Sequence, residues 1–134
     1  MPSKFKFSLR SYPNLSGVHP LLIVVAYRAL QLSSVDFGVT EGVRTLGRQH
    51  SLYNQGKSRT LNSRHIPGAD GLGKAIDVMA YIDGKGTWDW RYYEQIAAAF
   101  KQASQELNIA IDWGGNWTTF KDGVHFELSR KDYP

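Results

Sequence analysis

The 134-residue sequence contains no cysteine. This absence excludes disulfide bonds, thiolate nucleophiles and every cysteine-based zinc site, so any metal ligands must be histidines and carboxylates. Long apolar runs are also missing: the longest, from Pro20 to Tyr27, is far shorter than the ~20 residues of a membrane span. That run also lacks the position and cleavage site of a secretory signal. We therefore expect synthesis in a cytoplasm, no export signal and no stable membrane insertion.

The charge balance is basic but dispersed. Sixteen lysines and arginines against twelve acidic residues give a net charge of +4, which favours an anionic partner such as a bacterial cell wall. The basic residues form no helical stripe, and neither helix-turn-helix nor zinc-finger spacing is present, so we do not expect nucleic acid as the specific partner. The length fits a single domain over residues 1–134, and we expect a monomer.

Hydrophobic periodicity predicts an α+β fold, with about three helices around a small, mostly antiparallel sheet. Ser16 is expected to cap the first helix, Gly56 to end the second, and Asp89 and Asn108 to bound the third. The expected helices are 16–33, 45–56 and 89–108, and the expected strands are 36–42, 75–82, 109–113 and 123–128.

The strand at 75–82 carries an aspartate opposite its apolar face. Alternation places Ile76, Val78 and Ala80 on one face, which must pack against helices. Asp77 then points to the other face in mid-strand, where an unpaired carboxylate is costly to bury. Its partner is expected to be an arginine (Arg44 or Arg64), backbone donors or a metal ion.

The strand at 123–128 offers a matching histidine. His125 and Glu127 share its non-apolar face, and Asp122 lies three residues before the histidine. A lone histidine on a strand is more often structural than a ligand, but one flanked by carboxylates is typical of a metal site. With His65 and Asp77 it completes three ligands, the composition of a catalytic zinc site with an open position. Asp122 would then take a proton from water and pass it to the leaving amine.

Several ordered motifs resemble the LAS-type peptidoglycan metallopeptidases. These enzymes include VanY-like D,D-carboxypeptidases, D-alanyl-D-alanine dipeptidases and the L-alanyl-D-glutamate endopeptidases of bacteriophage lysis, and their fold resembles that of Hedgehog domains. The resemblance spans roughly residues 18–128, and the segment DWGGNW is most similar to the phage branch. It rests on SRH (63–65), GKAID (73–77), EGVRTLGRQHSLYNQGKS (41–58) and WGGNWTTFKDGVHFEL (113–128).

The resemblance implies a role for each matching residue. His65, Asp77 and His125 would hold one zinc ion, and Asp122 would be the general base. Arg44 would bind substrate or the developing oxyanion, although a structural ion pair is its alternative. The weaker implied roles are those of Gln49 and Ser63, as substrate or indirect contacts, and of Glu127, which would orient a histidine or pair with a basic residue. The glycine pair between Trp113 and Trp117 opens space beside the metal, so we also expect these two tryptophans to contact the substrate.

Three alternatives remain open within this assignment. Glu127 replaces Asp122 as the base if Asp122 faces solvent. Eleven residues separate His65 from Asp77, where the family usually has six, and the extra stretch contains a rival ligand, Asp70. We prefer Asp77, because the residues around Asp70 are typical of a turn, and Asp70 is expected to cap its own loop. We expect this insertion, residues 66–72, at the mouth of the cleft, so that deleting residues 67–71 changes activity more than metal affinity. His19 and His50 are not expected to be ligands.

The resemblance implies a zinc-dependent phage or prophage endolysin that hydrolyses the L-alanyl-D-glutamate bond in the peptide stem of peptidoglycan. We expect a catalytic domain without a separate wall-binding domain. It would act on the wall in the periplasm and depend on a holin-type permeabilising protein for host lysis. The alternative enzyme is a D,D-carboxypeptidase of peptidoglycan. The alternative of another class is a non-catalytic, Hedgehog-like zinc-containing binding module, against which Asp122 and Arg44 argue.

Overall fold

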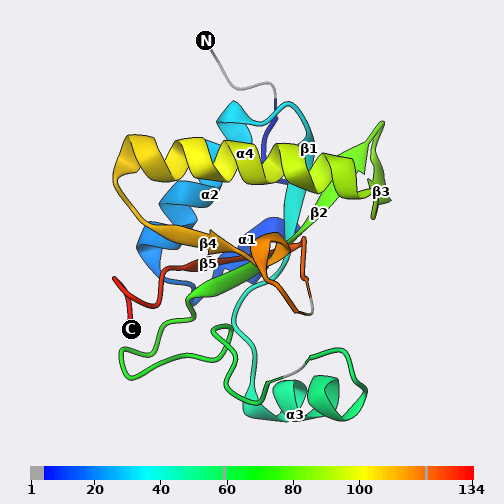
Figure 1. Cartoon of the computed structure of the whole chain (residues 1–134). Coiled ribbons are helices and arrows are strands. Elements are labelled where there is room, and N and C mark those ends of the chain that lie inside the picture. Colours follow the sequence, from blue (N-terminus) through cyan, green and yellow to red (C-terminus); the bar gives the residue numbers. More distant parts are fainter. Residues whose placement is uncertain (1–4, 59, 120) are drawn as a thin grey trace.

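One antiparallel sheet organises the computed structural model, which describes residues 5–58, 60–119 and 121–134 (Figure 1). Within those residues the sheet has the order β1–β2–β5–β4, and β3 pairs with β2. The predicted α+β class is confirmed. The strands are β1 (Asp36–Glu41), β2 (Ala75–Ile82), β3 (Lys85–Thr87), β4 (Ile111–Trp113) and β5 (His125–Leu128), and the helices are α1 (Ser11–Leu15), α2 (Pro20–Leu32), α3 (Leu46–Asn54), α4 (Trp90–Leu107) and the 3-10 turn η1 (Gly114–Asn116).

Helices α2 and α4 pack together and form the core with the apolar face of the sheet. The predicted apolar residues of β2 are fully buried there, as is Phe126 of β5. The rings of Phe100 on α4 and Phe126 on β5 stack with centroids 3.9 Å apart. Because this face of the sheet is committed to the core, the polar residues of β2 and β5 are left to the opposite face.

The start of α2 differs from the prediction. The helix begins at Pro20, and the cap is His19, whose Nδ1 accepts a hydrogen bond from the backbone N–H of Leu21. Ser16 is not the cap because Gly17, in the left-handed region at φ +79°, interrupts the helical path. Proline at the first helical position fits this start, since its missing N–H has no helical partner there. His19 is therefore the capping residue of α2.

The predicted boundaries at Gly56, Asp89 and Asn108 are confirmed, whereas β4 and β5 each begin two residues later than predicted. Asp89 accepts from the N–H of Arg91 at the start of α4, and Asn108 ends that helix with φ 55°. Thr45 caps α3, and Gly56, at φ +74°, follows its end. Two elements were not predicted: α1 and the three-residue strand β3.

Helix α3 projects away from the sheet and from α2 and α4 (Figure 1). All nine of its residues are described, and only Gln49 is buried. The helix is therefore attached largely through the segments before and after it. Among the described residues, no helix is both long and apolar enough to cross a membrane.

Candidate metal centre and catalytic cleft

The register of β2 against β5 places Asp77 directly opposite His125. Residues opposite each other on one face of an antiparallel pair have their Cβ atoms ~5 Å apart. The second neighbour is Glu41, which opposes Asp77 from β1 at a register shift after Val39. Register shifts of this kind change the direction of side chains near functional sites. Three polar side chains thus meet on the sheet face that the core does not use.

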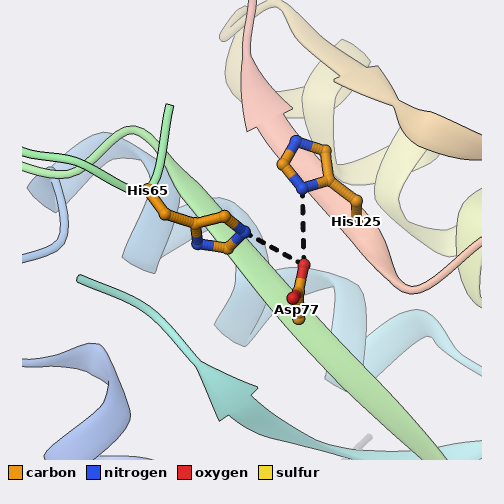
Figure 2. Close-up of side chains that lie close together, drawn as sticks. All are labelled: His65, Asp77 and His125. Carbon is orange, nitrogen blue, oxygen red and sulfur yellow. Dashed lines mark hydrogen bonds and ion pairs between the residues drawn. The ribbon is translucent and has the colours of Figure 1, made fainter. Parts of the chain in front are cut away.

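His65 joins this group from the loop before β2. Its Nε2 lies 3.1 Å from Oδ1 of Asp77, and Nδ1 of His125 lies 3.3 Å from the same oxygen (Figure 2). The backbone of the loop is fixed on both sides of the histidine, because the N–H of Arg44 donates to the carbonyl of His65 and the N–H of Lys74 to that of Arg64. The predicted triad of His65, Asp77 and His125 is therefore assembled from a loop and two strands.

The outer hydrogen bonds of the two histidines fix which ring nitrogen faces the centre. Nδ1 of His65 lies 2.8 Å from the carbonyl oxygen of Gly42, which only accepts, so this nitrogen carries a hydrogen. Nε2 of His125 lies 2.8 Å from a carboxylate oxygen of Glu127 and donates to it. Each neutral ring therefore presents its unprotonated nitrogen to the centre, as metal-ligating histidines do.

Burial and mutual attraction set the charges of the metal-free cluster. Burial would raise the pKa of Asp77, but the two imidazoles hold it well below its usual range. Burial would lower the pKa of His125, yet its hydrogen bonds to Asp77 and Glu127 raise it to about 9. Without a metal, an imidazolium therefore offsets the charge of the Asp77 carboxylate.

The three donors fit a divalent metal ion. Their ligand atoms all lie within 4.8 Å of one another, a spacing compatible with tetrahedral bonds of ~2.0–2.2 Å to imidazole nitrogen and carboxylate oxygen. Asp70 is not in this cluster: its Oδ1 accepts from the N–H of Leu72 and from Nζ of Lys74. The preference for Asp77 over Asp70 is supported by this geometry, and Asp70 caps its own loop as predicted.

Arg44 links the cluster to the base of α3. Its Nη2 lies 3.4 Å from Oδ2 of Asp77, its Nε donates to Glu41, and its Nη1 donates to Oε1 of Gln49. The guanidinium separates the carboxylates of Glu41 and Asp77, which would otherwise repel each other across the sheet. Gln49 has no exposed surface and donates to Ser58 and to the carbonyl of Thr60, so it holds Arg44 from behind.

The loop between η1 and β5 carries Asp122 to the centre. The N–H of Asp122 donates to the carbonyl of Gly114, and the N–H of His125 donates to the carbonyl of Asp122. A Cβ on Gly114 would overlap that carbonyl of Asp122 and lie 3.1 Å from Cβ of His125. Glycine is thus required where the two segments meet. Burial and the charge of Asp77 raise the pKa of Asp122, against the opposing effect of His125, His65 and Arg44.

The carboxylate of Glu127, unlike that of Asp122, contacts basic side chains. Its other carboxylate oxygen lies 3.6 Å from Nε of Arg64 and from Nε of Arg130. It therefore orients a histidine and also pairs with basic residues. Those contacts occupy both of its oxygens, whereas Asp122 makes no side-chain hydrogen bond or ion pair within the described part of the chain.

The cluster opens into a cleft of about 860 Å³. Ser63, Trp117 and Asp122 line it, together with Arg44 and the triad. Two predicted contacts do not line the cleft. Gln49 is buried and bonded to Arg44, and Trp113 packs against the core, its ring tilted against that of Trp90 with centroids 5.5 Å apart. The structure adds lining residues that sequence reasoning missed, among them Glu41, Leu52, Lys57, Trp88, Thr118 and Thr119. Of these, only Glu41 had a local signal, its spacing of three from Arg44.

The insertion at 66–72 corrects one expectation, because none of its residues lines the cleft. Gly73 at its end donates to the carbonyl of Gly17 and accepts from the N–H of His19. These bonds hold the loop beside the start of α2, away from the mouth of the cleft. The insertion therefore does not form part of the cleft wall.

Comparison with known proteins agrees with this geometry. A sequence model of the phage L-alanyl-D-glutamate peptidase family matches residues 3–133. The chain is 37% identical to the L-alanyl-D-glutamate peptidase of Escherichia phage T5, over 96% of this chain and 93% of that protein. It is 28% identical to the peptidoglycan L-alanyl-D-glutamate endopeptidase CwlK of Bacillus subtilis, over 90% and 79%. The crystal structure of Serratia marcescens L-Ala D-Glu endopeptidase ChiX superposes with a TM-score of 0.88 at 46% identity, covering 97% of this chain and 94% of that one. The chain belongs to the phage L-alanyl-D-glutamate peptidase family.

Proposed function

We propose that this chain is a zinc-dependent endopeptidase that hydrolyses the L-alanyl-D-glutamate bond in the peptide stem of peptidoglycan. One observation carries the proposal: a His–Asp–His cluster with a free carboxylate, Asp122, beside it in an open cleft. Two imidazoles and one carboxylate are a donor set that suits zinc. A zinc ion held there would lower the pKa of the water it binds and polarise a carbonyl group.

In this proposal Asp122 is the general base. Its raised pKa makes its carboxylate a better proton acceptor than an exposed aspartate. It would take a proton from the attacking water and deliver it to the amine of D-glutamate as the amide bond breaks. The carboxylate of Glu127 is engaged by His125 and two arginines, which supports assigning Asp122 as the base.

Arg44 would stabilise negative charge as it develops on the carbonyl oxygen of L-alanine. Its guanidinium lies in the wall of the cleft and is held by Glu41, Gln49 and Asp77. A positive charge fixed before the reaction needs little reorganisation when the charge develops. Ser63 and Trp117 would contact the substrate, while Gln49 and Trp113 would act by positioning Arg44 and the Asp122 loop.

The biological setting in this proposal is host lysis by a phage or prophage enzyme. The similarity to the phage T5 peptidase over nearly the whole chain supports it. The chain would act as a monomeric catalytic domain on peptidoglycan in the periplasm, once a holin-type protein permeabilises the membrane. Its positive charge would favour residence on the anionic wall.

The release of new amino groups from purified Gram-negative peptidoglycan tests the catalytic assignment. Wild-type protein should release them, a chelator should stop the release, and added zinc should restore it. Asp122→Asn should lower the rate by at least ~100-fold while zinc binding persists. Asp112→Asn is the matched control, because Asp112 also lines the cleft but lies outside the cluster. Equal losses in both variants, or full activity with chelator, would contradict the proposal.

A further inference from the structure

Three of the four tryptophans of the chain lie in or against the loop that carries Asp122, and the fourth, Trp88, lines the same cleft as Asp122. Nε1 of Trp113 donates to the carbonyl of Gly123, and a Cβ on Gly123 would lie 2.7 Å from the ring of Trp90. The ring of Trp117 lies 5.1 Å from that of His125. Trp88 and Trp117 line the cleft. The lining of the cleft thus has an aromatic part, called the aromatic wall and defined as Trp88 and Trp117, while Trp90 and Trp113 pack against the loop that carries Asp122.

Trp88 is the most unusual member of this wall, because 72% of its surface is exposed. The exposure does not come from a loose backbone. Thr87 on one side pairs with Ala80 in the sheet and accepts a hydrogen bond from the hydroxyl of Tyr93. Asp89 on the other side caps α4. A large apolar ring held in solvent on a fixed backbone, at the edge of a cleft, is typical of a binding surface.

Another part of the cleft lining is polar. It is lined by Lys57, Ser58, Thr60 and Ser63, from the segment that follows α3. In Figure 1, α3 and β3 lie at well-separated places on the molecule. Lys57 follows α3 and Trp88 follows β3 along the chain, so these two parts of the lining come from different regions of the fold. The cleft therefore combines the aromatic wall with a polar wall, defined as residues 57, 58, 60 and 63, and the His–Asp–His cluster lines the same cleft.

The proposed substrate has the same asymmetry about its scissile bond. The L-alanine side is attached through a lactyl group to an N-acetylmuramic acid ring, whereas the D-glutamate side carries free carboxylates. A sugar ring presents an apolar C–H face that an indole can cover, and carboxylates suit a polar wall with a cation. We propose that Trp88 contacts the sugar attached to the stem and makes the enzyme prefer glycan-linked stems over free peptides. This inference rests on the proposed function.

Kinetics on a matched pair of substrates test this role. One substrate is the disaccharide-linked stem, and the other is the same stem peptide without its sugars. Wild-type protein should show the higher kcat/KM on the glycan-linked stem. Trp88→Ala should lower that kcat/KM roughly tenfold, as for removal of one contact-making tryptophan, and leave kcat/KM on the free peptide unchanged. Trp88→Tyr, which keeps a ring, should restore part of the preference.

Tyr53→Ala is the control, since Tyr53 is also an exposed aromatic residue but does not line the cleft. It should leave both rates unchanged. Equal effects of Trp88→Ala on the two substrates, no effect on either, or a wild-type enzyme without a preference would each overturn the inference. If wild-type protein cleaves neither substrate, the proposed function itself fails, which is a distinct outcome.

Discussion

Nε2 of His125 donates to Glu127 across 2.8 Å, which leaves Nδ1 directed at Asp77. This pairing makes Glu127 a determinant of the protonation of His125, a candidate metal ligand. In the metal-free protein, Glu127→Gln should lower the pKa of His125 from about 9 towards the ordinary value, because a neutral amide stabilises imidazolium less than a carboxylate does. An NMR titration of the His125 ring measures this shift. Glu106→Gln, which alters an exposed pair with Arg28, should leave the His125 titration unchanged, as should any variant outside this network.

Metal binding should release a proton. At pH 7 the metal-free His125 is protonated, since its pKa is about 9, and it must lose the Nδ1 proton to bind a metal. The apparent zinc affinity should therefore rise about tenfold per pH unit from pH 7 towards 9 and then level off. Calorimetry in buffers of different ionisation enthalpy counts the protons. Release of no proton at pH 7 would contradict the charge state described for the cluster.

Arg44 should not be replaceable by lysine. Arg44→Lys keeps a positive charge but loses the planar fork that reaches Glu41, Gln49 and Asp77 together. We expect kcat to fall on the order of 100-fold with a smaller change in KM, because the lost interaction belongs to the developing charge. Arg48→Lys is the control: Arg48 also pairs with Glu41 but is largely exposed. A loss confined to KM would instead indicate that Arg44 stabilises the bound substrate and the transition state equally.

Gly114 should tolerate no side chain. In Gly114→Ala the new Cβ would overlap the carbonyl of Asp122, so the loop must move and carry the proposed base away from the centre. Activity should fall at least ~10-fold and more than zinc affinity does, because the overlap with the carbonyl of Asp122 is severe whereas the approach to Cβ of His125 is a tight contact of 3.1 Å. Gly47 is the control position, because its φ is not positive and a Cβ there would meet only Oγ1 of Thr45, at an ordinary contact distance of 4.0 Å. Gly47→Ala should keep full activity.

The sequence predicts those features that repeat along the chain. The alternation in β2 correctly separates Asp77 from Ile76 and Val78, and the helical periodicity of α4 correctly predicts burial of Ile96 and Phe100. Elements as short as α1 and β3, five and three residues, hold too few residues to show a period. The start of α2 was misplaced because Gly17 and Pro20 outweigh the capping preference of Ser16.

The sequence predicts the triad because the residue types that bind metals and the family motif select the same three residues. What the sequence could not supply is the register that sets Asp77 opposite His125, and the path of the chain between distant segments. The same limit explains the misplaced insertion at 66–72, whose direction depends on bonds between Gly73 and residues near the start of α2. It also explains why Trp88 was missed, since nothing local indicates that an exposed tryptophan borders a cleft.

The bond that is cleaved tests the central claim most directly. Mass spectrometry of the fragments released from purified Gram-negative peptidoglycan identifies it. The account predicts free stems whose first residue is D-glutamate, released by wild-type protein and lost both with a chelator and in Asp122→Ala. Release of D-alanine alone would contradict the account and indicate a D,D-carboxypeptidase. Bound zinc with no release at all would mean that the cluster belongs to a binding module.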